Sequence, residues 1–246
     1  ISLGCAKNRI DSELFLGVAK QYNIELTDSL DDADIIVVNT CGFIESAKQE
    51  AIDTILEVCD YQNKKIVVMG CLVERYQQSL EESIPEVDFY FPIRDYEKVD
   101  DLFKKLTSTN LSYKMDYTKR VITTSKHSAY LRIAEGCDNK CAYCAIPLIR
   151  GKFKSRDCDS LIEETKYLVS MGAKEITLIA QDTTRYGTDF KDKDNRRLEH
   201  LLRAVSEVEG VEWVRVLYLY PDEITKEILL EIKENKKVAK YFDIPI

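Results

Sequence analysis

The chain has 246 residues, 45% of them hydrophobic, which is enough for one large domain or two ordinary ones. Its net charge of -8 does not favour broad binding to nucleic-acid phosphates, which needs basic patches. The sequence has no apolar run of membrane-spanning length and no signal peptide, and its eight cysteines do not resemble a secreted disulfide framework. We therefore expect a cytoplasmic protein that contacts no membrane and does not bind nucleic acid directly.

Three apolar runs in the first half of the chain each end in a cysteine. The runs cover 1–5, 35–41 and 66–71. The second and third are rich in β-branched residues, which is typical of strands buried on both faces of a parallel sheet. Apolar residues at helical spacing predict helices over 11–21, 45–60, 72–83 and 95–106, with a further short strand at 87–91. This alternation predicts an α/β fold that begins with a doubly wound parallel sheet.

The cysteines that end these runs are Cys5, Cys41 and Cys71. Because neighbouring parallel strands lie only about 4.8 Å apart and open α/β sheets bind ligands at their carboxyl edge, we expect the three thiols to converge there. Two alternatives stay open. The thiols are three unrelated small core residues, or they form a three-thiolate zinc site whose fourth ligand is not evident.

A polar stretch at 108–126, rich in Ser, Thr and Lys, separates the two halves. We therefore predict a first domain of 1–107, a linker of 108–126 and a second domain of 127–246. The second domain alternates strands with helices, at 129–134, 160–171, 175–181, 198–208, 213–218, 223–235 and 241–246. Asp159 or Ser160 is expected to cap the first of these helices. The repeat predicts a partial TIM-type barrel.

Both ends of the sequence look cut. The chain begins inside one apparent strand and stops inside another. Four strands cannot close a barrel of this type. We therefore expect the sequence to be a fragment of a longer protein.

The second domain opens with a cysteine loop directly after its first strand. Cys137, Cys141 and Cys144 have the spacing C-x3-C-x2-C. Thiolates are soft ligands, so the loop predicts a metal or iron–sulfur site. It supplies three ligands, whereas a structural zinc site needs four. A 4Fe-4S cluster on three cysteines would leave one iron open to a substrate.

In barrels of this kind the loops after the strands share one mouth. We expect the cysteine loop, 181–186 and 218–221 to lie there, with most charged residues of 182–196 in a mobile surface loop. The sequence does not decide whether Arg150 and Arg156 face an anionic substrate group or pair with nearby acids.

The two histidines and the two cysteines outside these sites are expected to have no role in the chemistry. His127 and His200 are interpreted as surface or core residues rather than ligands. Cys59 lies on an apolar helix face and Cys158 just before a helix, so both are interpreted as spare thiols.

Several stretches, taken together, resemble one family. They are 2–8 (SLGCAKN), 39–47 (NTCGFIESA), 134–137 (AEGC), 145–147 (AIP), 150–151 (RG), 155–156 (SR), 181–187 (QDTTRYG) and 217–221 (LYLYP). With the C-x3-C-x2-C loop, they are similar to the radical S-adenosylmethionine methylthiotransferases, across essentially the whole chain. The details resemble members that modify a ribosomal protein, whereas members that modify transfer RNA usually differ at 181–187. The family normally continues beyond 243–246 with the rest of the barrel and a small β-domain.

The resemblance implies two 4Fe-4S clusters and S-adenosylmethionine. One cluster would bind S-adenosylmethionine at its open iron, and its ligands would be Cys137, Cys141 and Cys144. An auxiliary cluster would carry the transferred sulfur, and its ligands would be Cys5, Cys41 and Cys71. Tyr143 would lie near the adenine, with a packed aromatic as the alternative, and Gln181 would contact S-adenosylmethionine.

The resemblance also implies a reaction. A 5'-deoxyadenosyl radical would remove hydrogen from the β-carbon of an aspartate in a small-subunit ribosomal protein, the twelfth, and a second S-adenosylmethionine would supply the methyl group. An electron donor such as flavodoxin or ferredoxin would be a partner. Two alternatives are methylthiolation of a transfer RNA adenosine and a non-catalytic iron–sulfur or zinc-binding protein.

Overall fold

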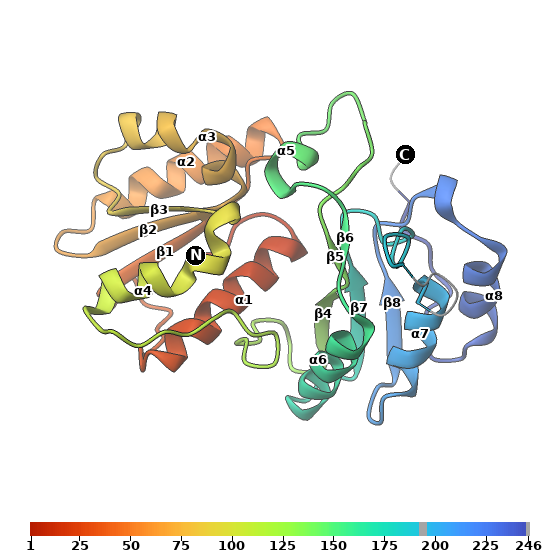
Figure 1. The fold of residues 1–246 in the computed structure, drawn as a ribbon. Coiled ribbons are helices and arrows are strands. Elements are labelled where there is room, and N and C mark those ends of the chain that lie inside the picture. The colour runs from red at the N-terminus through yellow and green to blue at the C-terminus, as the bar shows by residue number, and fades with distance from the viewer. Residues whose placement is uncertain (192–195, 245–246) are drawn as a thin grey trace. The chain divides into compact units, whose positions relative to one another are not determined.

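A computed structural model describes residues 1–191 and 196–244 (Figure 1). The chain forms two compact units, one of Ile1–Val121 with Cys141–Arg150 and one of Ile122–Lys140 with Gly151–Ile246. These boundaries differ from the predicted domains 1–107 and 127–246. Residues up to Val121 pack with the first unit because Tyr22 Oη donates to the Leu111 carbonyl (2.8 Å) and the Val121 amide donates to the Glu13 carbonyl (3.0 Å).

The first unit is built on a parallel sheet. Its strands are β1 (Ile35–Thr40), β2 (Lys65–Gly70) and β3 (Phe89–Pro92), hydrogen-bonded in that order. The N-terminal segment lies beside β1, with a parallel bridge between Ser2 and Asn39. Because the chain returns to the same edge after each helix, the ends of these strands and the residues that follow them gather there.

Helices cover both faces of this sheet, as Figure 1 shows. On one face α2 (Glu45–Cys59) and α3 (Cys71–Ser83) pack on the alternate residues of β1 and β2, and on the other α1 (Ala6–Gln21) and α4 (Val99–Thr107) do so. The doubly wound parallel α/β arrangement is therefore confirmed. The predicted helix at 95–106 is divided, because the 3-10 turn η1 (Ile93–Lys98) precedes α4.

The second unit contains a second parallel sheet. It has β4 (Ser128–Arg132), β7 (Glu175–Ile179) and β8 (Trp213–Val216) in that order, and between and after them α6 (Cys158–Ser170), α7 (Leu198–Glu207), η2 (Pro221–Glu223) and α8 (Lys226–Glu234). A two-residue pair, β5 (Ala134–Glu135) and β6 (Lys154–Ser155), is antiparallel. Sequential parallel strands joined by helices form the predicted partial TIM-type barrel.

Two local predictions in the second unit are wrong. Asp157, rather than Asp159 or Ser160, caps α6, because its carboxylate accepts from the backbone amides of both those residues. The expected strand at 241–246 is absent from the described residues 241–244, and 245–246 lie outside the described part of the chain. Instead, Val238 makes a parallel bridge to Val214 of β8.

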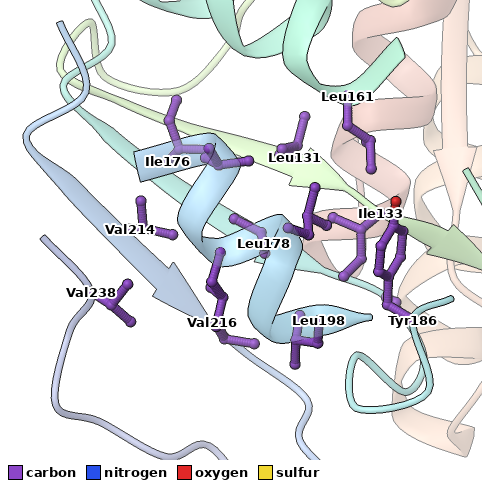
Figure 2. Close-up of a cluster of buried hydrophobic side chains, with 14 of the residues drawn as sticks. Leu131, Ile133, Leu161, Ile176, Leu178, Tyr186, Leu198, Val214, Val216 and Val238 are labelled. Carbon is purple, nitrogen blue, oxygen red and sulfur yellow. The ribbon is translucent and has the colours of Figure 1, made fainter. Parts of the chain in front are cut away.

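The core of the second unit lies between its sheet and helices, as Figure 2 shows. Leu178 is fully buried at its centre, among neighbours that include Leu131 and Val216.

Replacing Leu178 by Ala should lower the free energy of unfolding by about 2–5 kcal/mol, because the cavity left there refills only in part. Urea unfolding would measure this loss. The matched Leu229→Ala variant, 45% exposed, should change the same quantity by less than about 0.5 kcal/mol. Equal losses would contradict this core.

Candidate functional site

In the first unit, two of the predicted cysteine ligands contact the same side chain, that of Asn8. Cys5 lies just before α1, and Cys71 is the first residue of α3. The Cys5 Sγ lies 3.5 Å from the Asn8 Oδ1, and the Cys71 Sγ lies 3.7 Å from the same oxygen. Asn8 and Cys71 are 63 positions apart in the sequence, and they are neighbours at the carboxyl edge of the sheet.

Cys41, which follows β1, lies against the same place. A Cβ atom built on Gly4 would be 2.9 Å from the Cys41 Cβ, 3.4 Å from its Sγ and 3.6 Å from the Asn8 Cγ. Gly4 directly precedes Cys5, so Cys41 and Asn8 are both neighbours of the backbone that leads into Cys5. We call Cys5, Cys41 and Cys71 together the three-cysteine site.

Asn8 is fully buried and held by the end of β1. Its Nδ2 donates to the Thr40 carbonyl (2.8 Å) and to the Asn39 Oδ1 (3.3 Å), and the Asn39 Nδ2 donates back to the Asn8 carbonyl (2.7 Å). These bonds fix the Oδ1 that faces the two thiols. The sequence interpretation missed Asn8; its spacing of seven residues from the apolar Phe15, on one helix face just after a cysteine, is the signal that could have indicated it.

The turn from β2 into α3 requires glycine. Gly70 has a φ of +102°, and a Cβ there would lie 2.4 Å from the Asn39 Oδ1 and 2.6 Å from the Thr40 carbonyl oxygen. No L side chain fits so close to this backbone. The turn places Cys71 at the first position of α3, where the positive end of the helix dipole favours a thiolate.

A buried ion pair adjoins Cys71. The Arg150 Nη2 lies 2.8 Å from the Asp11 Oδ2, and the two side chains are 2% and 0% exposed. The same nitrogen lies 3.4 Å from the Cys71 Sγ. Burial raises the pKa of the Cys71 thiol, and the Arg150 guanidinium opposes this rise. Arg150 therefore pairs with an acid of its own chain; Asp11 is a second residue that sequence interpretation missed.

The donor set of the three-cysteine site fits a 4Fe-4S cluster. Its thiols are reduced, two lie at helix N-termini, and a guanidinium compensates the negative charge that thiolates and sulfide would bring. In such a cluster each thiolate binds a different iron. Among residues 1–191 and 196–244, no three or more His, Cys, Asp or Glu side chains are arranged to hold a single metal ion.

The cysteine loop is divided between the two units. Cys137 belongs to the second unit, where it is buried, and its amide donates to the Gly151 carbonyl (3.1 Å). Cys141 and Cys144 belong to the first unit and are partly exposed, and the Cys144 amide donates to the Cys141 carbonyl (3.0 Å). A short helix that the sequence did not predict, α5 (Ile146–Arg150), follows them.

Two family models match this chain. The model of the radical SAM superfamily matches residues 131–246, and that of the uncharacterized protein family UPF0004 matches residues 1–92. The ribosomal protein uS12 methylthiotransferase RimO of Clostridium tetani is 50% identical over 257 residues, and that of Clostridium novyi is 51% identical over 257 residues. Both alignments cover 100% of this chain and 57% of the relative.

Along its whole length the chain is similar to the RimO-type radical S-adenosylmethionine methylthiotransferases. It spans somewhat more than half the length of the curated relatives that it matches. Among solved structures, the radical S-adenosylmethionine methyltransferase TsrM of Kitasatospora setae, with cobalamin and a [4Fe-4S] cluster bound, is similar with a TM-score of 0.59. That alignment covers 93% of this chain and 56% of TsrM at 11% identity, so it shows the fold alone.

In the second unit the loops after β5, β7 and β8 are joined by hydrogen bonds. Asn139, two residues after Cys137, donates to the Asp182 Oδ2 (3.0 Å) and accepts from Arg185 (3.2 Å). The Tyr220 amide donates to the Thr184 Oγ1 (3.3 Å). Asp182 is fully buried, so the predicted mobile surface loop at 182–196 is packed where it begins. Residues 192–195 of that loop lie outside the described residues.

The two predicted S-adenosylmethionine contacts differ in exposure. Tyr143 is 83% exposed, so it does not pack in the core. Gln181 follows β7, and its Nε2 donates to the Glu135 Oε1 (2.8 Å), which belongs to a carboxylate that also pairs with Arg132. The Gln181 Oε1 is buried and, within the described ranges, has no hydrogen-bond partner. A buried acceptor without a partner is costly unless a ligand satisfies it.

Arg156, the two histidines and the two remaining cysteines lie in surroundings that do not indicate a role in the chemistry. Arg156 pairs with the buried carboxylate of Glu164 (2.6 Å) and donates to the Arg132 carbonyl (2.8 Å), so it faces an acid of its own chain. His127 is exposed, and the side chain of His200 is 37% exposed. Cys59 and Cys158 are both partly buried, and burial raises the pKa of each thiol. No helix within residues 1–191 and 196–244 is long and apolar enough to cross a membrane.

Proposed function

We propose that this chain is the catalytic part of an enzyme that methylthiolates the β-carbon of an aspartate in the small-subunit ribosomal protein uS12. The convergence of Cys5, Cys41 and Cys71 at one sheet edge carries this proposal, because the same chain also has the C-x3-C-x2-C loop. The substrate is supported by relatives that are 50% identical and are named ribosomal protein uS12 methylthiotransferases.

The proposed enzyme uses two 4Fe-4S clusters and S-adenosylmethionine. Cys137, Cys141 and Cys144 would hold the first cluster, and the three-cysteine site would hold the auxiliary one. When bound, these cofactors supply the electron, the radical chemistry and the sulfur, so the protein contributes binding, orientation and exclusion of water. No side chain of this chain is proposed as a general acid or base.

The chain's own residues would orient S-adenosylmethionine at the ends of β5 and β7. The buried Gln181 Oε1 offers an acceptor to a donor on the ligand, and Glu135 fixes the amide through its bond to the Nε2. The exposed ring of Tyr143 offers an apolar surface to the adenine. The bonds between Asn139 and the loop at 182–185 would hold the start of the cysteine loop, at Cys137, in one position.

The proposed partners follow from the reaction. They are uS12, which provides the aspartate, and a one-electron donor such as flavodoxin or ferredoxin, and we place the reaction in the cytoplasm. The net charge of -8 is compatible with a basic protein as substrate and does not favour a direct contact with nucleic acid.

The complete protein, reconstituted anaerobically with iron and sulfide, would test this function. We expect about eight irons per chain, reductive cleavage of S-adenosylmethionine, and a methylthio group on uS12 by mass spectrometry. Transfer RNA serves as the competing substrate in the same assay. Methylthiolated transfer RNA with unmodified uS12 would replace the proposed substrate, and bound zinc without iron would favour a non-catalytic metal-binding protein.

A further inference from the structure

Arg150 places a positive charge inside the three-cysteine site. Its Nη2 lies 3.4 Å from the Cys71 Sγ, 3.4 Å from the Asn8 Oδ1 and 2.8 Å from the Asp11 Oδ2. The Arg150 side chain is 2% exposed and that of Asp11 is fully buried. Because water is excluded from this pair, its charges are screened far less than surface charges are.

The position of Arg150 depends on the segment that follows the cysteine loop. Arg150 and Cys71 are 79 residues apart in the sequence, and Arg150 reaches Cys71 from α5. Ala145 and Ile149 of the same segment pack against Cys71, together with Ile93. The end of the segment Cys141–Arg150, from residue 145 onward, thus contacts the three-cysteine site, and the same segment carries two of the proposed ligands of the first cluster.

A cation and an N–H donor next to a cysteine sulfur have a known effect on a cluster. Both stabilise the reduced state, which carries one more negative charge than the oxidised state, so both raise the reduction potential. A carboxylate at the same place acts in the opposite direction. Asp11 both orients the guanidinium of Arg150 and partly cancels its charge.

We propose that Arg150 is a positioning residue that raises the reduction potential of the auxiliary cluster by donating to the Cys71 sulfur, and that Asp11 limits this rise. This inference rests on the proposed function, because it requires a cluster at the three-cysteine site. Arg150 belongs to the segment that carries Cys141 and Cys144. Through Arg150, this segment would adjust the reduction potential of the auxiliary cluster.

The test isolates the auxiliary cluster. In the complete protein, Cys137, Cys141 and Cys144 are replaced by Ala, so that about four irons remain per chain. An anaerobic redox titration followed by electron paramagnetic resonance then gives the midpoint potential. Arg150→Met in this background should lower the ratio of reduced to oxidised cluster at a fixed potential about tenfold, which is about 59 mV for one electron. Arg150→Lys keeps the charge and should lower the ratio less.

Two further variants separate an electrostatic role from a structural one. Asp11→Asn removes the opposing negative charge and should move the potential upward, whereas Arg150→Met moves it downward. A purely structural role predicts shifts of the same sign or none. Arg156→Met is the matched control, since it also removes an arginine from an ion pair with a buried carboxylate, in the second unit, and should leave the potential unchanged.

Each outcome is decisive. An Arg150→Met protein that binds about four irons at an unchanged potential overturns the inference and leaves the proposed function intact. If the protein with Cys137, Cys141 and Cys144 replaced by Ala binds no iron, the proposed function itself is overturned. Where Arg150→Met fails to assemble the cluster, Arg150→Lys and Asp11→Asn give the result, because opposite shifts support the inference and parallel shifts overturn it.

Discussion

The complete protein with Cys5, Cys41 and Cys71 all replaced by Ala is expected to cleave S-adenosylmethionine and to make no methylthio product. It should retain about half of the iron of the wild type, because only the first cluster would remain. The physical reason is that these thiols lie at one sheet edge in the first unit, Cys5 and Cys71 at Asn8 and Cys41 at Gly4, whereas Cys137 is hydrogen-bonded within the second. Anaerobic iron analysis, S-adenosylmethionine cleavage and mass spectrometry of uS12 give the three readouts.

The control for that prediction uses the two cysteines outside both sites. A Cys59→Ala, Cys158→Ala double variant should keep the full iron content and the full product yield, because neither thiol is proposed as a ligand. Loss of S-adenosylmethionine cleavage together with half the iron in the triple variant would contradict two independent clusters. Full iron in the triple variant would show that the three-cysteine site holds none.

Gly136→Ala should abolish most of the radical chemistry by displacing Cys137. Gly136 has a φ of +76°, and a Cβ there would lie 2.1 Å from the Lys152 carbonyl oxygen and 2.6 Å from that of Gly151. The backbone must move, and the bond from the Cys137 amide to the Gly151 carbonyl lies at that point. We expect S-adenosylmethionine cleavage to fall about 100-fold, as it does when reacting groups are misplaced by about 1 Å.

Gly151 provides a matched control because it shares the backbone conformation without the close contact. Its φ is +72°, and a Cβ there would meet nothing within 4 Å. Gly151→Ala should therefore cost only the left-handed strain of about 1–2 kcal/mol, whereas Gly136→Ala should cost about 1–3 kcal/mol more from overpacking. Urea unfolding of both variants measures the difference. Equal losses in the free energy of unfolding would mean that the backbone at Lys152 moves away from the new Cβ without a measurable cost.

The sequence predicted the parts of this fold that depend on local periodicity. Continuous β-branched runs indicated the buried parallel strands, and the rule that such strands end at a common edge brought Cys5, Cys41 and Cys71 together. Element ends were less accurate. α1 begins at Ala6 rather than at 11, and Asp157 caps α6, because a cap depends on one hydrogen bond that neighbouring polar residues could also make.

The polar residues around the site could not be predicted in this way. Asn8 lay outside the helix predicted at 11–21, Asp11 was only its first residue, and the role of Arg150 stayed open between a substrate anion and an acid of its own chain. Their burial depends on residues 31 to 139 positions away, such as Asn39 for Asn8 and Asp11 for Arg150. Periodicity reports which face of an element is apolar, and it carries no information about which buried polar groups meet.

By itself, the sequence determined that two sets of three cysteines exist, one in a local loop and one at strand ends, and that both sheets are parallel. These features follow from spacing and hydrophobic pattern, which act over a few residues. Only the tertiary structure decided that the segment Cys141–Arg150 packs with the first unit and that its last residue pairs with Asp11 beside Cys71. The reason is energetic: a buried guanidinium must find a carboxylate, and only the folded chain brings one within reach.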